Sequence, residues 1–406
     1  MNINRSFRSL WMGQSLANFA DSLYILAVVM LVFRTTGSTI LSALIPVIRL
    51  SAMLISGFFA PLVMDRFRLW TILFFSQGTQ TLLLLILSIN MITKSSHPLA
   101  PVCSFIALTS FFDGWSTPAR NAIVPRIVPK ERLVTANGLL SSTDQIVLLV
   151  GWGLGGLLVE WLGANHVLWF SVIFLALSTF SLLWVHDPAS KGAPASIDRS
   201  KWTSAKEGWH YLFSHPVLKR LALMDIFDYT ASSVWAGAII LTYVVKVLHR
   251  EEAWWGFING IYFAGTMIGG LLVIRFAEAL KRKFLAALAF GGGTMSLLTV
   301  VYALNSLPVL SLLVCFFMGP PSQAKEIAKR TIYQTETPQE TLPKVFAAQN
   351  MLSYLSFGLA VLWMGWVADH VSVRGVYISA ALFYGVSTLV ATTLKSGHAP
   401  YKKLGT

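Results

Sequence analysis

The sequence predicts an all-α membrane protein with twelve transmembrane helices in two pseudo-symmetric six-helix halves. Composition is the first observation behind this prediction: hydrophobic residues fill 55% of the 406 positions, charged residues fill 12%, and the mean hydropathy is +0.64. Soluble domains carry about twice that share of charged residues. The second observation is the length of the apolar segments, because each approaches the ~20 residues that a spanning helix needs.

Twelve such segments follow one another along the chain, with short polar connections between most of them. By residue number they are 9–33, 39–64, 69–92, 99–124, 134–158, 164–186, 219–246, 254–277, 283–304, 308–333, 345–368 and 373–395.

The third observation is a weak internal repeat. Arg66-Phe67 recurs as Arg275-Phe276, and a later Pro-x-Glu-x-Leu pattern recurs at the same offset of 209 residues. Several matches at one offset indicate duplication. We therefore expect a six-helix bundle over 1–186, a cytoplasmic linker over 187–218, and a second bundle with a short tail over 219–406. Within the linker, "SAKEGWHYLFS" is expected to form a short amphipathic helix at the membrane surface.

The basic residues predict the orientation. The chain carries a net charge of +13, which on a soluble protein would suggest a nucleic-acid partner. Here nearly all of the 31 Lys and Arg residues fall at cytoplasmic segment ends if both termini are inside, so topology explains the excess and no nucleic-acid partner is expected. Lys325, Lys329 and Lys344 are counted on the cytoplasmic side. The exceptions are Arg34, Lys94, Lys246, Arg250 and Arg374 in outer loops and Arg49 within a span.

The sequence lacks the motifs of several kinds of catalytic and metal-binding site. No G-x-x-x-x-G-K-[ST] phosphate loop occurs, so we expect no ATP hydrolysis and no enzyme activity. No H-E-x-x-H or paired-cysteine motif suggests a metal, and no cofactor is expected. Cys103 and Cys315 both fall in spans, so a structural disulfide is not expected.

The first span carries a polar stripe. Gln14, Asn18 and Asp21 recur at i, i+4 and i+7, which places them on one face of a helix. A carboxylate in mid-span is costly and predicts a functional site, or alternatively an ion pair that orders two helices. Arg49, also near the middle of a span, is the expected partner. Such a pair favours the ionised carboxylate, so Asp21 carries a proton only if transport breaks the pair.

The seventh span also carries acidic residues: Asp225 and Asp228 lie on one helical face and are followed by Ser232. Two neighbouring carboxylates repel, which favours a shared proton. Alternatively, Asp225 lies near the cytoplasmic end and is simply solvated. Further candidates are the span acids Asp113 and Asp144, each either a proton site or a helix–helix hydrogen bonder, and the cavity aromatics Trp115 and Trp235.

Two motifs carry a family resemblance. "GFFAPLVMDRFRLW", with Asp65, Arg66 and Arg68, resembles the cytoplasmic loop motif of the major facilitator superfamily, and "GGLLVIRFAEALKRK" resembles its second copy. "PARNAIVPRIVPKERLVTANGLLSSTDQIVLLVGWGLGG" is similar to the macrolide-efflux and siderophore-export branch and its antiporter motif. The second loop copy contributes Gly269, Gly270 and Arg275, and the antiporter-like stretch contributes Gly151, Gly153, Gly155 and Gly156.

The resemblance implies the major facilitator fold and a multi-pass transporter of the plasma membrane with both termini in the cytoplasm. It implies a monomer that exports a drug-like or siderophore-like amphiphile in exchange for protons by rocker-switch alternating access. The loop motif implies gating, and the glycines imply close helix packing. Asp21, Asp228, Asp113 and Asp144 are the proton-coupling candidates. Import or flipping of a metabolite or lipid, and a non-transporting sensor or assembly role, remain alternatives.

Overall fold

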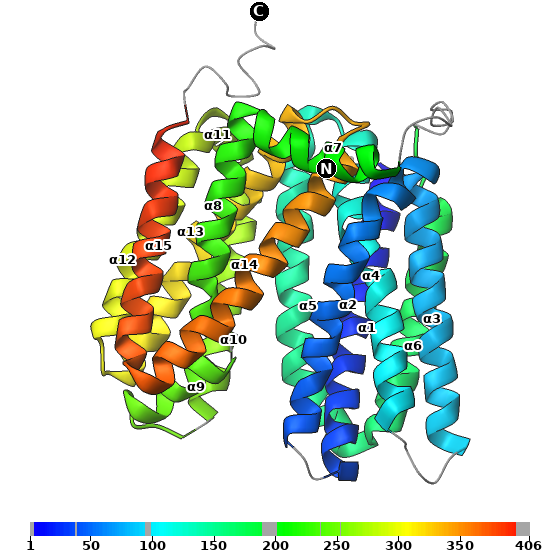
Figure 1. Ribbon diagram of the computed structural model, residues 1–406, viewed down its shortest axis with the longest axis horizontal. Coiled ribbons are helices and arrows are strands. Elements are labelled where there is room, and N and C mark those ends of the chain that lie inside the picture. The colour runs from blue at the N-terminus through cyan, green and yellow to red at the C-terminus, as the bar shows by residue number, and fades with distance from the viewer. Residues whose placement is uncertain are drawn as a thin grey trace, which may run out of the picture. The chain divides into compact units, whose positions relative to one another are not determined.

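A computed structural model describes residues 4–36, 39–93, 99–188, 201–235, 237–251 and 253–394. Three parts of the sequence-based predictions lie outside these residues: the outer-loop Lys94, the first part of the linker at 189–200, and the tail from 395 onward. The described chain is helical throughout, and its helices divide into two compact units (Figure 1).

The first unit comprises residues 1–129, 147–209 and 339–348. In it, α1 packs against α2 and α6, and α4 packs against α2 and α3. Its helices are α1 (Arg5–Thr36), α2 (Thr39–Arg66), α3 (Leu69–Thr93), α4 (Leu99–Ile127), the later part of α5 (Leu133–Leu162), α6 (Ala164–Ser181) with the short η2 (Leu182–Trp184), and most of α7 (Lys201–Ser214).

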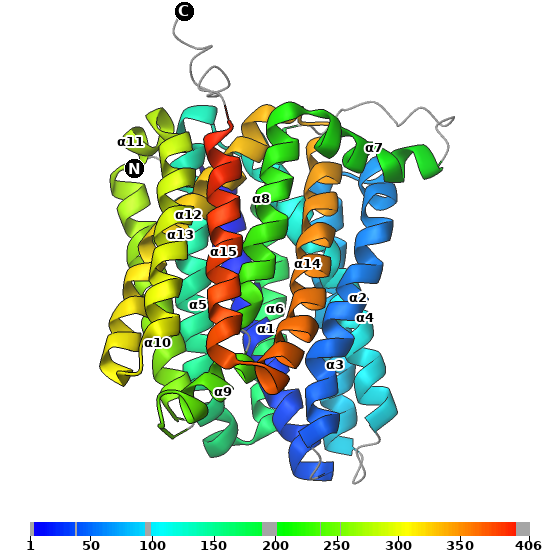
Figure 2. The same ribbon diagram turned by 60° about the vertical axis from the view of Figure 1, so that its left-hand side comes forward.

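The second unit comprises residues 130–146, 210–338 and 349–406. In it, α10 packs against α13, and α15 lies beside both α12 and α8 (Figure 2). Its helices are η1 (Lys130–Arg132), the start of α5, α8 (Pro216–Ser232), η3 (Ser233–Trp235), α9 (Gly237–Lys246), α10 (Ala253–Arg275), α11 (Ala277–Arg282), α12 (Phe284–Leu304), α13 (Pro308–Glu336), most of α14 (Leu342–His370) and α15 (Val373–Thr392).

Each of the twelve predicted spans coincides with a helix or, for the seventh, with α8, η3 and α9 in succession. Within the described residues, nine helices are long and apolar enough by composition to cross a membrane. α4, α8–α9 and α13 fall outside that set, and these elements carry Asp113, Asp228 and Lys325. The helix predicted within the linker is present as α7.

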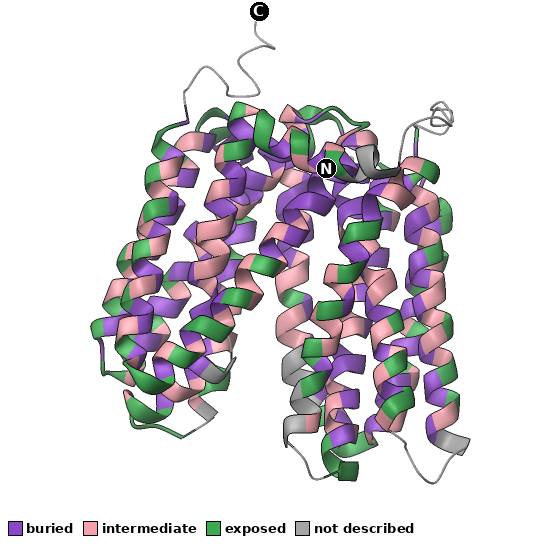
Figure 3. Cartoon of the chain, in the orientation of Figure 1, coloured by how far each residue is buried: buried purple, intermediate pink, exposed green. Residues whose placement is uncertain are grey.

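Apolar side chains fill the interior of each unit, and many others are exposed on its outside. Figure 3 shows how buried and exposed positions alternate along the helices. In the first unit, Leu23 and Val28 of α1 are buried with Val167 and Leu168 of α6. Large side chains such as Leu82, Phe290 and Leu382 are at least half exposed. Such an apolar exterior would be unfavourable in water and fits helices that face lipid.

Candidate functional site

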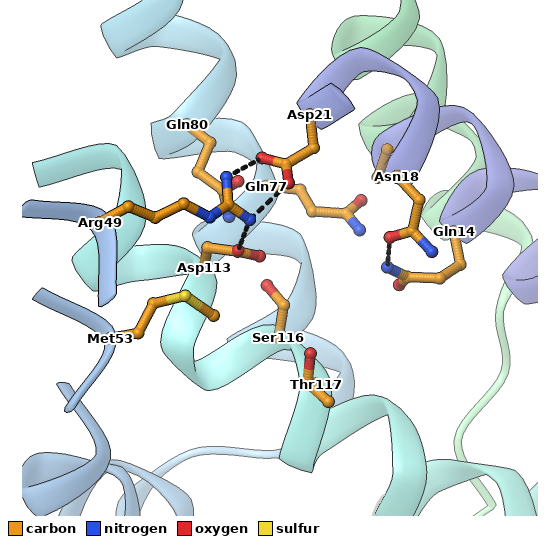
Figure 4. A pocket seen from close by; sticks show the side chains of 11 residues that line it. Gln14, Asn18, Asp21, Arg49, Met53, Gln77, Gln80, Asp113, Ser116 and Thr117 are labelled. Carbon is orange, nitrogen blue, oxygen red and sulfur yellow. Dashed lines mark hydrogen bonds and ion pairs between the residues drawn. The ribbon is translucent and has the colours of Figure 1, made fainter. Parts of the chain in front are cut away.

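Three charged side chains converge inside the first unit, and we call Asp21, Arg49 and Asp113 the arginine triad (Figure 4). The Arg49 guanidinium donates to both oxygens of Asp21, with Nη1–Oδ1 at 2.8 Å and Nη2–Oδ2 at 2.5 Å. It also donates to Asp113 Oδ2 at 3.2 Å and to the Tyr24 hydroxyl at 3.1 Å. The pairing of Asp21 with Arg49 that the sequence predicted is therefore confirmed, and Asp113 joins it as a second carboxylate.

Local packing brings Asp113 of α4 against Arg49 of α2. Gly114 follows Asp113 directly, and a Cβ atom there would lie 2.6 Å from the Ser56 Oγ and 2.8 Å from its Cβ. Only a glycine lets α4 approach α2 this closely, so the Asp-Gly dipeptide of α4 sets the position of its own carboxylate. The Trp115 indole then donates to the Ser56 carbonyl oxygen at 3.1 Å and fastens the same contact.

The arginine triad forms part of the wall of a polar cavity of about 130 Å³. The predicted stripe of α1 faces this cavity, and Gln14 donates to the Asn18 side chain at 2.9 Å (Figure 4). The remaining wall is mainly polar and comes from α2, α3 and α4, with one residue of α1. Its residues are Ala17, Met53, Gln77, Gln80, Ser116 and Thr117.

Chemically, two carboxylates here share one guanidinium. Asp21 has the bidentate contact, while Asp113 has the single longer one, so the wall carries more acceptor charge than its arginine matches at hydrogen-bonding distance. Buried Arg120, two turns further along α4, adds positive charge to the surroundings of Asp113. The arrangement suits a group that brings its own positive charge, such as a proton or a cation.

A second group of charges lies inside the second unit, and we call Asp225, Asp228, Lys325, Glu326 and Lys329 the lysine cluster. Lys325 Nζ lies 2.6 Å from Asp228 Oδ1. Lys329 Nζ lies 2.7 Å from Asp225 Oδ1, 3.2 Å from Asp228 Oδ2 and 3.0 Å from Glu326 Oε2. Two ammonium groups therefore hold three carboxylates.

The lysine cluster corrects two expectations. Lys325 and Lys329 are not cytoplasmic charges, because α13 buries both of them. Asp225 is not solvated: it is 1% exposed and also accepts from the Tyr333 hydroxyl at 2.9 Å and the Gln349 amide at 3.1 Å. The two carboxylates of α8 are consequently not left to repel each other. The missed signal was the i, i+4 spacing of Lys325 and Lys329 within the predicted span 308–333.

The loop acid Asp65 has a buried partner. Lys344, in the first turn of α14, lies with its Nζ 2.5 Å from Asp65 Oδ1 and 2.6 Å from Glu207 Oε2 of α7. Lys344 is thus buried rather than solvated, and one ammonium group joins the end of α2 to the linker helix. The other gating candidates, Arg66, Arg68 and Arg275, are exposed.

The glycine candidates lie at close helix contacts where their surroundings are described. A Cβ at Gly151 would lie 2.7 Å from the Ser22 Cβ, and one at Gly155 would lie 2.9 Å from Leu26 Cδ2, so α5 packs closely on α1. Gly269 faces Pro320 and Gly270 faces Ser142 in the same way. The surroundings of Gly153 and Gly156 are outside the described part of the chain.

The remaining candidates are not among the described residues that line the polar cavity. Trp115 packs its ring on Phe111 and Phe112, and Trp235 packs on Tyr302 and Tyr377 at centroid distances of 5.0 and 5.3 Å. The Ser232 hydroxyl donates to the carbonyl oxygen of its own helix at Tyr229. Asp144 is half-buried on α5 and is not among the described residues that line the cavity.

Comparisons with known proteins agree on one family. The Major Facilitator Superfamily profile matches residues 10–324. The MFS-type transporter YfmI of Bacillus subtilis (strain 168) is 32% identical over 388 residues, which cover 95% of this chain and 96% of YfmI. Macrolide efflux protein A of Streptococcus pyogenes is 21% identical and covers 92% of each chain.

The chain is also similar to a multidrug efflux pump in sequence and to a solved transporter structure in fold. The multidrug efflux pump Tap of Mycolicibacterium fortuitum is 24% identical over 289 residues, covering 68% of this chain and 67% of Tap. The crystal structure of the human organic anion transporter MFSD10 superposes with a TM-score of 0.80 at 11% identity, covering 95% of this chain and 99% of that one. At this low sequence identity, the structural similarity shows a shared fold only.

Proposed function

The chain belongs to the Major Facilitator Superfamily and is a membrane transporter of small molecules, and from this premise we propose that it exports an amphiphilic compound in exchange for protons. The proposal places it in the plasma membrane with both termini in the cytoplasm, working as a monomer by rocker-switch alternating access. It also assigns the coupling to carboxylates within the spans, with Asp21 and Asp228 as the leading carriers.

The arginine triad is the observation that carries the proposal. A carboxylate in mid-membrane is costly unless it is paired or faces water. Asp21 has both a guanidinium partner and a cavity beside it. Asp113 shares the same guanidinium, so a proton that arrives on one carboxylate leaves the other as the counter-ion of Arg49. Proton uptake here does not leave Arg49 without a counter-ion.

The efflux direction and the substrate class rest on the relatives. The printed names of two of them are a macrolide efflux protein and a multidrug efflux pump. The cavity of this chain adds a chemical argument, because its polar wall with two carboxylates suits a substrate that carries a cationic or hydrogen-bonding group.

The proposal is tested with the full chain in proteoliposomes and two probes, the cationic dye ethidium and a macrolide. We expect an imposed pH gradient to drive accumulation of at least one probe, and a proton ionophore to abolish that accumulation. Protein-free liposomes provide the background. Accumulation of neither probe, or accumulation that the ionophore leaves unchanged, would overturn proton-coupled export of this substrate class.

A further inference from the structure

The two lysines of the lysine cluster are bound in different ways. Lys329 meets three carboxylates, Asp225, Asp228 and Glu326, which matches the three N–H donors of an ammonium group. Lys325 meets one carboxylate, Asp228, and its second partner is the uncharged Ser387 hydroxyl at 3.0 Å. Loss of the Asp228 charge would therefore leave Lys329 paired with two carboxylates, whereas Lys325 would lose the one carboxylate that it meets among the described residues.

The carboxylates differ as well. Asp225 is 1% exposed and receives hydrogen bonds from Lys329, Tyr333 and Gln349. The Asp228 side chain is 13% exposed; its charged partners are the two lysines, and the Ser387 hydroxyl is a neutral hydrogen-bond partner. Asp228 is thus the carboxylate of α8 that a proton can reach, and Lys325 is the cation that its protonation would release.

Two of three consecutive glycines on α12, Gly291 and Gly292, lie against this lysine. A Cβ at Gly292 would lie 3.1 Å from Lys325 Nζ and would also contact the Thr388 hydroxyl. A Cβ at Gly291 would lie 2.7 Å from the Lys325 Cβ and 2.7 Å from the Pro321 carbonyl oxygen. We call Gly291 and Gly292 the glycine slot, because the missing side chains leave the path of the Lys325 side chain open along its length.

We propose that Lys325 is the exchangeable counter-ion of Asp228, and that Gly292 positions it by keeping open the space beside its ammonium group. When a proton from water binds a carboxylate oxygen of Asp228, an O–H bond forms and the ion pair with Lys325 is lost. The ammonium keeps its own protons and moves within the glycine slot. When Asp228 releases its proton, the ion pair forms again.

This inference rests on the proposed function for its role in transport, but the counter-ion exchange itself needs no substrate. The groups that face Asp228 come from several elements. Those that titrate or carry charge are Asp225 on α8, Lys325, Glu326 and Lys329 on α13, and Tyr384 on α15. Tyr229 on α8 and Arg330 on α13 interact in turn with Glu326.

The test uses the full chain in lipid and follows its conformational equilibrium against pH, from distances between two spin labels, one on each unit. A second readout is the pH profile of ethidium transport. The variants are Gly292→Ala, Lys325→Met and the two combined. The matched control is Gly293→Ala, because a Cβ there would meet nothing nearer than Thr388 Cγ2 at 3.8 Å.

We expect Lys325→Met to move the midpoint of both pH profiles upward by roughly 1 to 3 pH units, since the carboxylate loses a cation that favours its ionised form. Gly292→Ala should move the midpoint in the same direction. The double variant should match Lys325→Met, and Gly293→Ala should match the parent. If Lys325→Met folds poorly, Asp228→Asn with Lys325→Met should restore folding and lose this titration.

An unchanged midpoint in Lys325→Met would overturn the counter-ion assignment, and an unchanged midpoint in Gly292→Ala would overturn the role of Gly292. So would a further shift when Gly292→Ala is added to Lys325→Met. These outcomes are distinct from failure of the proposed function. In that case the spin-label distances still titrate as described, while ethidium does not accumulate under a pH gradient.

Discussion

Arg49 and Asp21 form a bidentate ion pair inside the first unit, with nitrogen–oxygen distances of 2.5 and 2.8 Å. The guanidinium also reaches Asp113, so one cation of α2 joins α1 and α4. Such a pair links two helices and also sets the charge balance of the site. Removal of the cation leaves two neighbouring carboxylates, whereas protonation of one carboxylate leaves a balanced pair.

Arg49→Ala should lower the stability of the protein more than removal of an exposed arginine does. Both partners are partly exposed, so we expect a loss of about 1–3 kcal/mol, between the values for surface and fully buried pairs. Thermal unfolding in detergent measures the difference, with exposed Arg34→Ala as the control. Adding Asp21→Asn should recover part of the loss, and no recovery would argue against repulsion between the carboxylates.

Lys344→Met should slow transport while leaving insertion into the membrane largely intact. The substitution removes the cation that Asp65 and Glu207 share at the first turn of α14. Asp65→Asn should act in the same direction, with a smaller effect because the pair with Glu207 survives. Transport rates in reconstituted vesicles check both variants, and the exposed Lys219→Gln is the control. Equal rates in all four proteins would show that this contact does not gate transport.

The glycines of α5 should be sensitive to a single added methyl group. Gly151→Ala places a Cβ against Ser22, and we expect a stability loss of about 1–3 kcal/mol from overpacking. Gly365→Ala on α14 is the matched control, since a Cβ there has no described heavy atom within 4 Å. Thermal unfolding should separate the two variants, and identical midpoints would contradict the close packing of α5 on α1.

The orientation is open to a direct check. The distribution of Lys and Arg predicts both termini on the cytoplasmic side. Lys325 and Lys329 no longer count toward this argument, because they are buried in α13, but the remaining bias is still inward. Tags at the two ends should be protected in intact cells and labelled after permeabilisation. Labelling of either tag in intact cells would reverse the assignment.

The sequence predicted the helices well because lipid imposes a strong local pattern. Apolar length alone places the spans, and mid-span polar residues such as Asp21, Arg49 and Asp228 stand out against it. It predicted partners less well. Asp228 pairs with Lys325, which is 97 residues away in the sequence. Lys325 is followed by Lys329 and Arg330, and this basic segment near the end of α13 led to the prediction that the lysine is cytoplasmic. Gln77 and Gln80 were missed because a neutral amide stands out less against an apolar span than a charged side chain does, although its burial also requires hydrogen bonds.

The measurement that tests the account most directly compares uphill accumulation with exchange in proteoliposomes for Asp21→Asn. This variant keeps the polar stripe of Gln14 and Asn18 and leaves Arg49 paired with Asp113. If Asp21 carries the coupling proton, ethidium accumulation under a pH gradient is lost, while exchange of labelled for unlabelled ethidium without a gradient persists. If Asp21→Asn accumulates ethidium at the parent rate, Asp21 is a structural partner of Arg49 and the central claim is wrong.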